Sequence, residues 1–370
     1  MLHIKNFIFK YRKMIFIFAA FLVLFAASFS SSFYHQTLIR VTSVNNTFTK
    51  VKEGFNGQKE NCYNQNITAR IRNGSHRGKT VNFSHDFSYS ETLSDEYHPG
   101  DQIFVKLKEN SDGSLGVSLL YDKRDSYLFL FIGIFILLLL FLFQKKGFLT
   151  LLSAGVNGLF FFLCLSFYKT DAFFDWIWIL EVLFFVTVTL LFVSGIHRKT
   201  LGAILSSLLT VFLVTILYYF TVYADEDIPY EMLPNMVPNL PLYKVFLIST
   251  VLGLLGAVMD IAITMNASIH EIICASDRVT LSAAIKSVFE IGHDTMGTMV
   301  SVMFFSYLSG SFPLIVLKFT NNYTIDTLFS IDYVFDMIRF LISSIGIVLA
   351  IPISGFVAII LFRKGLVREN

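Results

Sequence analysis

The residues best able to do chemistry lie between positions 253 and 311, inside two otherwise apolar runs. In the first run, Asp260 is an acidic residue among small and apolar neighbours. At about 100° per residue, the small and polar residues of this run fall on one helix face. They are Gly253, Gly256, Ala257, Asp260, Thr264, Ala267 and Glu271. Such a face predicts a close neighbouring helix, because small residues permit close approach and polar ones need partners.

The second run carries a matching face, with spacings of three and four. Its members are Glu290, His293, Asp294, Gly297, Thr298 and Ser301. The connection between the two runs is short, so we expect the two faces to pack against each other. In that arrangement Asp260 lies in the cytoplasmic half of a membrane, with His293 and Asp294 near the cytoplasmic mouth.

Two interpretations of these residues compete. In one they form a proton or cation relay, because a membrane favours the protonated form of a carboxyl and histidine titrates near neutral pH. In the other, Asp260 bonds Thr298 or Ser301 and only fixes the helix pair. We favour the relay. Its candidate members are Asp260, Thr264, Glu271, Glu290, His293, Asp294 and Thr298, and the helix-packing candidates are Gly253, Gly256, Ala257 and Gly297.

No other set of residues predicts catalysis. His270 and Glu271 begin a zinc-protease pattern, but Cys274 stands where the second histidine would be. The other cysteines, Cys62 and Cys164, are too distant in sequence for a metal pattern or a disulfide framework. We therefore expect no enzyme, no metal site and no cofactor. A net charge of +2 also gives no argument for a nucleic acid partner.

The composition predicts which elements position these residues. Of 370 residues, 54% are hydrophobic and 15% charged, whereas globular domains carry about 25% charged residues. A bilayer core about 30 Å thick needs about 20 apolar helical residues. Eight runs meet or nearly meet this length: 14–33, 127–143, 148–168, 173–196, 200–223, 245–269, 295–317 and 334–362. The predicted fold class is a polytopic α-helical protein of the lipid bilayer, with about eight spans.

Charged residues interrupt two of the other runs. Asp175 and Glu181 lie near the outer end of their run and are weaker relay candidates. Asp336 and Arg339 are three residues apart on one helix, a spacing typical of an ion pair.

Basic residues predict the orientation, since cytoplasmic segments are enriched in Lys and Arg. Basic clusters occur in the 1–13 segment, in the short loops near 145, 198 and 278, and in the 363–370 tail, so both termini are expected in the cytoplasm. We interpret 14–33 as an uncleaved signal anchor, with a cleaved signal peptide as the alternative. The remaining parts are a 127–223 bundle of four spans, a 224–244 extracytoplasmic loop, and a 245–362 part with the polar faces.

Residues 34–125 form a polar segment unlike the rest of the chain. Short alternating runs are separated by turn dipeptides that contain glycine. These are Asn73-Gly74, Arg77-Gly78, Pro99-Gly100 and Asp112-Gly113. The pattern predicts a small extracytoplasmic β domain, a barrel or sandwich of about five strands. His76, His85 and His98 do not have the spacing of metal ligands.

Three segments resemble the YibE/F-like family of bacterial multipass membrane proteins: 256–271, 291–299 and 307–314. Gly100-Asp101 in the β domain also fits the family. The resemblance covers the chain from about Val41 and is most specific over 253–313. It implies a bacterial plasma membrane. Because members often look paired, it also implies a second YibE/F-like membrane protein, or a homo-oligomer, as partner.

A more distant similarity is to the central helices of SecD/SecF and resistance-nodulation-division transporters, where an embedded Asp belongs to a proton-driven relay. Gly256, Asp260 and an acidic residue about a dozen positions later carry this similarity. The Asp-Arg-x-x-Glu loop motif of those proteins is incomplete here, with only Asp277 and Arg278 in place. Proton coupling is therefore implied by analogy.

We expect a transport or export component in which Asp260, with His293 and Asp294, couples a proton or cation to the movement of a substrate. The alternative is a non-transporting membrane subunit or sensor whose extracytoplasmic β domain binds a partner.

Overall fold

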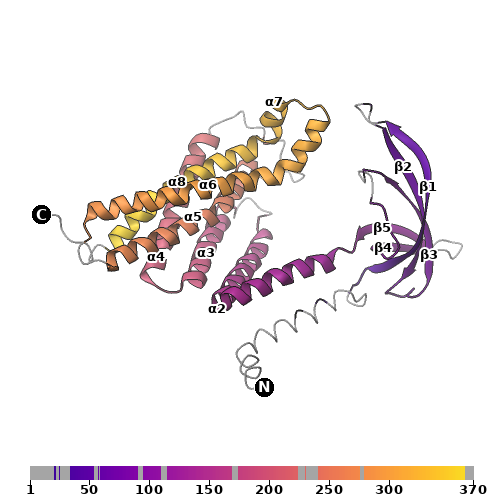
Figure 1. Ribbon diagram of the computed structural model, residues 1–370, viewed down its shortest axis with the longest axis horizontal. Coiled ribbons are helices and arrows are strands. Elements are labelled where there is room, and N and C mark those ends of the chain that lie inside the picture. The colour runs from indigo at the N-terminus through magenta and orange to yellow at the C-terminus, as the bar shows by residue number, and fades with distance from the viewer. Residues whose placement is uncertain are drawn as a thin grey trace, which may run out of the picture. The chain divides into compact units, whose positions relative to one another are not determined.

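A computed structural model describes Phe21, Phe25 and residues 34–362, except 54–56, 58, 91–94, 110–114, 169–173, 224–229, 231–240 and 276–278. The chain divides into two compact units, Met1–Gln144 and Lys145–Asn370. The first contains a β domain and the second a helical bundle (Figure 1).

The β domain is a five-stranded antiparallel sheet, as the sequence predicted. Its strands are β1 (Thr37–Glu53), β2 (Lys59–Ile71), β3 (Thr80–Ser88), β4 (Gln102–Glu109) and β5 (Leu115–Asp122), in the order β3-β2-β1-β4-β5. Placing β4 beside β1 gives the strand order of a Greek key. Because β3 also approaches β5, the sheet curves toward a partly open five-stranded barrel. Alternate residues such as Ile39, Ile67 and Ile103 fill its small core.

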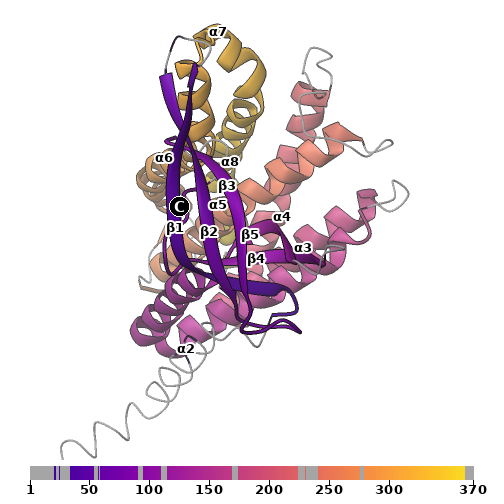
Figure 2. The ribbon, with the colours of Figure 1, turned by 90° about the vertical axis from the view of Figure 1, so that its right-hand side faces the viewer.

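Three of the four predicted turns are confirmed by their glycines. Gly74, Gly78 and Gly100 have φ angles of 78°, 91° and 110°, which disfavour residues with a Cβ atom. The fourth predicted turn, Asp112-Gly113, lies outside the described residues. β1 and β2 are the longest strands and extend past the other three (Figure 2).

The helical elements follow from the apolar runs. They are α2 (Asp125–Leu165), α3 (Phe174–Ser194), α4 (Arg198–Tyr218), η3 (Tyr219–Tyr223), α5 (Leu242–Ala275), α6 (Leu281–Thr320), α7 (Ile325–Thr327), η5 (Leu328–Asp332) and α8 (Val334–Phe362). In the described part of the chain, six helices are long and apolar enough to cross a membrane. α2 is broken at Gln144, whose φ is 48°, between the expected spans 127–143 and 148–168.

With the two halves of α2 counted apart, seven of the eight expected spans are present as helices. The remaining one, 14–33, lies outside the described residues except for Phe21 and Phe25. The prediction of a multipass α-helical protein with a β domain is therefore confirmed at this level.

The core of the helical unit lies between α4, α5 and α8, and α6 packs mainly on α8. Glycines on these helices permit close contacts. A Cβ added at Gly355 on α8 would lie 2.4 Å from Cγ1 of Val288 on α6, and one added at Gly292 on α6 would lie 2.3 Å from Cγ2 of Ile351 on α8. The helix pair therefore depends on glycine at both positions.

Candidate functional site: the polar faces of α5 and α6

Asp260 lies near the middle of α5, on the side of the helix that the bundle leaves exposed. The opposite side of α5 is apolar. Leu254, Val258 and Ile261 are each fully buried there. Among the described residues, Asp260 has no hydrogen bond or ion pair. An aspartate near the middle of a long apolar helix is thus left open by its own chain.

The predicted face of α6 is also exposed. Its exposed members are Glu290, His293, Asp294, Gly297, Thr298 and Ser301. This orientation follows from the way α6 meets α8, because Ala284, Val288 and Gly292 occupy the buried side of the helix. The polar residues, three or four positions apart, therefore project away from α8.

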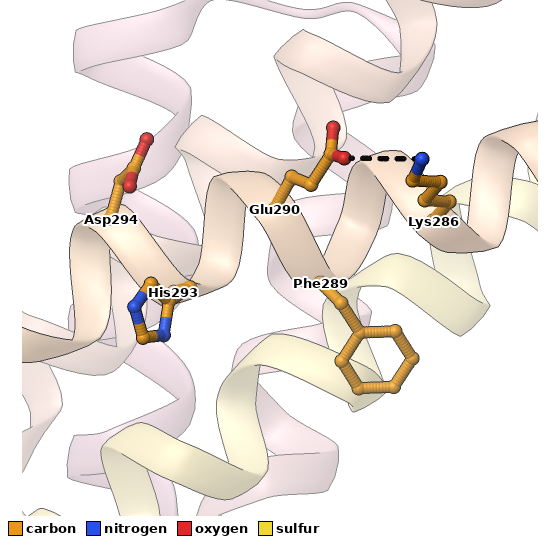
Figure 3. A pocket seen from close by; sticks show the side chains of 5 residues that line it. All are labelled: Lys286, Phe289, Glu290, His293 and Asp294. Atoms are coloured by element: carbon orange, nitrogen blue, oxygen red, sulfur yellow. Dashed lines mark ion pairs between the residues drawn. The ribbon is translucent and has the colours of Figure 1, made fainter.

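Four polar or charged residues of α6 line an open hollow of about 640 Å³ together with Phe289 (Figure 3). They are Lys286, Glu290, His293 and Asp294. Lys286 Nζ lies 3.8 Å from Glu290 Oε1, a loose pair with both side chains more than half exposed. Loose exposed pairs contribute little to stability. The hollow therefore offers an imidazole and carboxylates that a ligand or a second protein chain could contact.

Gly253, at one end of the α5 face, approaches α6 at a residue outside the predicted polar face. A Cβ added at Gly253 on α5 would lie 2.5 Å from the hydroxyl of Tyr307 on α6. Gly256 and Gly297 have no neighbouring atom within 4 Å of such a Cβ. Ala257 is partly buried against the core. Gly256 and Gly297 thus border open space, and the predicted packing of face against face stays a prediction.

The hydroxyl groups that could bond Asp260 instead bond their own helix. Thr298 Oγ1 donates to the carbonyl of Thr295 at 2.9 Å, and Ser301 Oγ donates to the carbonyl of Gly297 at 2.8 Å. The structural alternative, in which one of them ties Asp260 to α6, is not seen in the described residues. Of the other relay candidates, Thr264 is partly buried and Glu271 is exposed. The relay role of all these residues stays a prediction.

α5 also buries a polar residue, Asn266, that was not among the predicted site residues. Asn266 is fully buried, and its Nδ2 donates to the carbonyl of Ala262 at 2.9 Å and to Ser206 Oγ on α4 at 3.3 Å. Its Oδ1 has no hydrogen-bond partner and faces Gly202, where an added Cβ would lie 2.1 Å away. The signal was available, because an amide inside a span needs partners from another helix.

The remaining charged pair of the bundle forms as predicted. Arg339 Nη1 lies 3.0 Å from Asp336 Oδ1 on α8, and Ser311 of α6 donates a hydrogen bond to the same carboxylate. The guanidinium also lies over the ring of Phe246, 5.1 Å from its centre. This network accounts for both charges without a ligand.

The β domain has its own charged cluster beside the start of α2. Arg124 Nη2 lies 2.5 Å from Asp95 Oδ2 and 3.1 Å from Asp122 Oδ2. Burial, with a hydrogen bond that protonated Asp122 donates to Asp95, raises the pKa of Asp122. Burial also raises the pKa of nearby Tyr97. These groups border a hollow of about 300 Å³.

Comparison with known proteins identifies both parts of the chain. Residues 131–364 match the profile of the YibE/F-like protein family, and residues 32–121 match that of the YibE/F family N-terminal domain. Comparisons with curated proteins and with solved structures gave no match. The two family profiles cover the helical part and the β domain, and together most of the sequence. The chain therefore belongs to the YibE/F family.

Proposed function

We propose that this YibE/F-family protein is a transport or export component of a bacterial plasma membrane. Asp260, with His293 and Asp294, couples the movement of a proton or cation to that of the substrate. The observation that carries this proposal is the position of Asp260 near the middle of a long apolar helix, exposed and without a hydrogen bond or ion pair among the described residues. Ionisable groups at membrane depth usually face a water-filled cavity or another polar helix, where they mark ion pathways.

The small burial of α6 supports the same proposal. The buried residues of this 40-residue helix are Ala284, Val288, Gly292 and Met303, so the polar face at 290–301 is left exposed. Lipid is a poor solvent for the polar face of such a helix. We therefore include in the proposal that a second YibE/F-like chain, or a second copy of this one, covers that face. Basic residues in the loops favour an orientation with the β domain outside the cytoplasm.

Complementation of cells that lack the protein tests the coupling residue. We expect wild type to restore the cellular content of metal ions and metabolites, and Asp260→Asn to fail, because the amide cannot bind and release a proton. Asp260→Glu keeps the carboxyl and should restore part of the effect. Asp326→Asn, at an exposed position next to α6, is the matched control and should behave as wild type. Full restoration by Asp260→Asn at normal protein levels would rule out the coupling role.

Cysteine cross-linking tests the covering chain. In a Cys274→Ser background, Ser301→Cys on the polar face should form a disulfide-linked pair or a mixed pair with a partner protein. Ser306→Cys is a matched control, since it is exposed on the same helix but points away from the polar face. Equal cross-linking at both positions would contradict an interface on the polar face.

A second candidate function is supported by the outer part of the sheet. β4 pairs only with Thr37–Arg40 of β1, so in the described residues no strand pairs with that edge of β1 from position 43 to 53. On the core-facing side, Phe48, Tyr63 and Phe87 form a row of rings with centres 5.9 Å and 5.3 Å apart. Phe48 remains 58% exposed. Open strand edges and exposed aromatic rings are surfaces that bind peptides.

This candidate is a membrane subunit or sensor whose β domain binds a partner protein. It predicts that Phe48→Ala abolishes co-purification of the partner, whereas Tyr89→Ala, at an exposed aromatic residue outside the row, does not. It also predicts that Asp260→Asn leaves function intact. The two variants together therefore separate the candidates.

A further inference from the structure

Glu181 is a carboxyl group enclosed within the helical unit. It lies on α3 and is 0% exposed. In the expected topology α3 starts at the outer surface, so Glu181 is about 10 Å along the helix from that end, at about 1.5 Å per residue. Asp260 and Glu181 therefore differ sharply: the first is exposed, and the second is covered by its own chain.

Among the described residues, Glu181 accepts one hydrogen bond and forms no ion pair. Tyr168, just after α2, donates its hydroxyl to Glu181 Oε2 at 2.6 Å. Glu181 Oε1 is buried and has no hydrogen-bond partner in the part of the chain that the structure describes. Cys164 of α2 is also buried, and its thiol is near enough to Glu181 for an electrostatic interaction between the two groups. Asp175, earlier on α3, is paired instead with Lys244 of α5 at 2.9 Å. Among the described residues of α4, no titratable group interacts electrostatically with Glu181.

A bare carboxylate in this position would be costly. Removing a charged carboxylate from water costs several kcal/mol unless a cation or several hydrogen bonds compensate it. Among the described residues, only the Tyr168 hydroxyl bonds Glu181. A metal cation would need several oxygen ligands, and the described residues contain no group of three or more His, Cys, Asp or Glu side chains placed to hold one. A proton on Oε1 removes the charge without further ligands.

We propose that Glu181 is a proton-binding site of the helical unit, with Oε1 as the atom that takes the proton and Tyr168 as the residue that positions the carboxyl. Proton binding at Glu181 stands independently of transport. Its use as a second proton site, nearer the outer surface than Asp260, rests on the proposed function.

Infrared difference spectroscopy of the full chain in lipid tests this proposal. Wild type should show the carbonyl stretch of a protonated carboxylic acid at neutral pH, and Glu181→Gln should lose that band. Asp175→Asn is the control, because Asp175 is on the same helix but is paired with Lys244, and this variant should retain the band. Tyr168→Phe removes a donor that stabilises the carboxylate, so the band should persist to a higher pH than in wild type.

A chemical label provides a second measurement that does not need Glu181→Gln to fold. A hydrophobic carbodiimide adds to a protonated carboxyl, and rearrangement gives a stable N-acylurea that keeps all atoms of the reagent. Mass spectrometry of wild type should locate the adduct on Glu181, with less of it as pH rises. The proposal would be overturned if the infrared band were unchanged in folded Glu181→Gln. It would also be overturned if wild type gave no adduct on the peptide that contains Glu181. Neither readout requires transport. The result for Glu181 is therefore independent of whether Asp260→Asn restores function in the complementation test.

Discussion

Asp260 and Asn266 are six residues apart on α5 and differ in burial. Six residues at about 100° each place them about 120° apart around the helix, on different sides. Asp260 is exposed, whereas Asn266 is fully buried beside Ser206 and Gly202. Periodicity grouped Asp260 with Gly253 and Gly256, which are all exposed. It could not say which side of α5 the bundle would cover, because both sides carry small or polar residues. The exposure of that face depends on α4 and α8, which take the apolar side.

Glu181 shows the same limit at a single residue. The sequence marked it as an interruption near the end of a run, but burial depends on Tyr168 and Cys164, which a separate helix supplies. Polar residues inside apolar runs could thus be found from the sequence. Partners on the same helix, such as Asp336 and Arg339, could also be found, but partners on other helices could not, because spacing within one run does not say which helix packs beside it.

The raised pKa of Asp122 predicts that the stability of the β domain depends on pH. Its folded pKa is raised above the ordinary value of 3.8, so the folded state holds the proton more tightly than the unfolded chain. Stability from this group is present at low pH and is lost as pH rises through the folded pKa. We expect Asp122→Asn to stabilise the β domain at neutral pH, with a smaller gain as pH falls toward 3.8.

Hydrogen exchange of the β4 and β5 amides in the full chain, expressed as protection factors, measures this effect. Glu53→Gln, at an exposed position of the same sheet, serves as the control and should give no pH-dependent gain. Greater protection of wild type than of Asp122→Asn at neutral pH would contradict the assignment.

Among the elements, α6 combines two different surfaces. One side packs tightly on α8 through Gly292 and Val288, and the other presents polar residues to its surroundings. The sequence predicted the polar side from its spacing. It did not distinguish glycines that make close contacts, such as Gly355, from those that border open space, such as Gly256.

This difference predicts unequal effects of the same substitution. Gly355→Ala should destabilise the helical unit by about 1–3 kcal/mol, because the added Cβ overlaps the branched side chain of Val288. Gly256→Ala meets no atom within 4 Å and should change stability by less than about 0.5 kcal/mol. Trp176 and Trp178 are the two tryptophans of the chain and both lie on α3, so their fluorescence during denaturation reports this unit. Equal destabilisation by the two variants would contradict the packing described.

At the scale of the whole molecule, the chain joins a β domain to a multipass helical unit, and both match YibE/F profiles. Composition and run length predicted both parts, because lipid requires long apolar helices and a polar segment of about 90 residues can fold by itself. The strand order β3-β2-β1-β4-β5 was beyond the sequence, since neighbouring strands there need not be consecutive.

The native cysteines permit a direct test of the predicted topology. Cys62 and Cys164 are buried and Cys274, at the end of α5, is exposed. A membrane-impermeant maleimide should label Cys274 only after the cells are permeabilised, because that end of α5 is expected in the cytoplasm. Tyr89→Cys in the β domain should be labelled in intact cells. Labelling of Cys274 in intact cells would reverse the orientation.

The central claim is that a proton or cation gradient drives the function through Asp260. Collapsing the proton gradient in cells that carry wild type tests it most directly, with metal and metabolite content as the readout. The claim predicts that a protonophore reduces wild type to the level of Asp260→Asn and that it has no additional effect on that variant. Asp260→Asn cells that match untreated wild type, and that respond to the protonophore as wild type does, would contradict it.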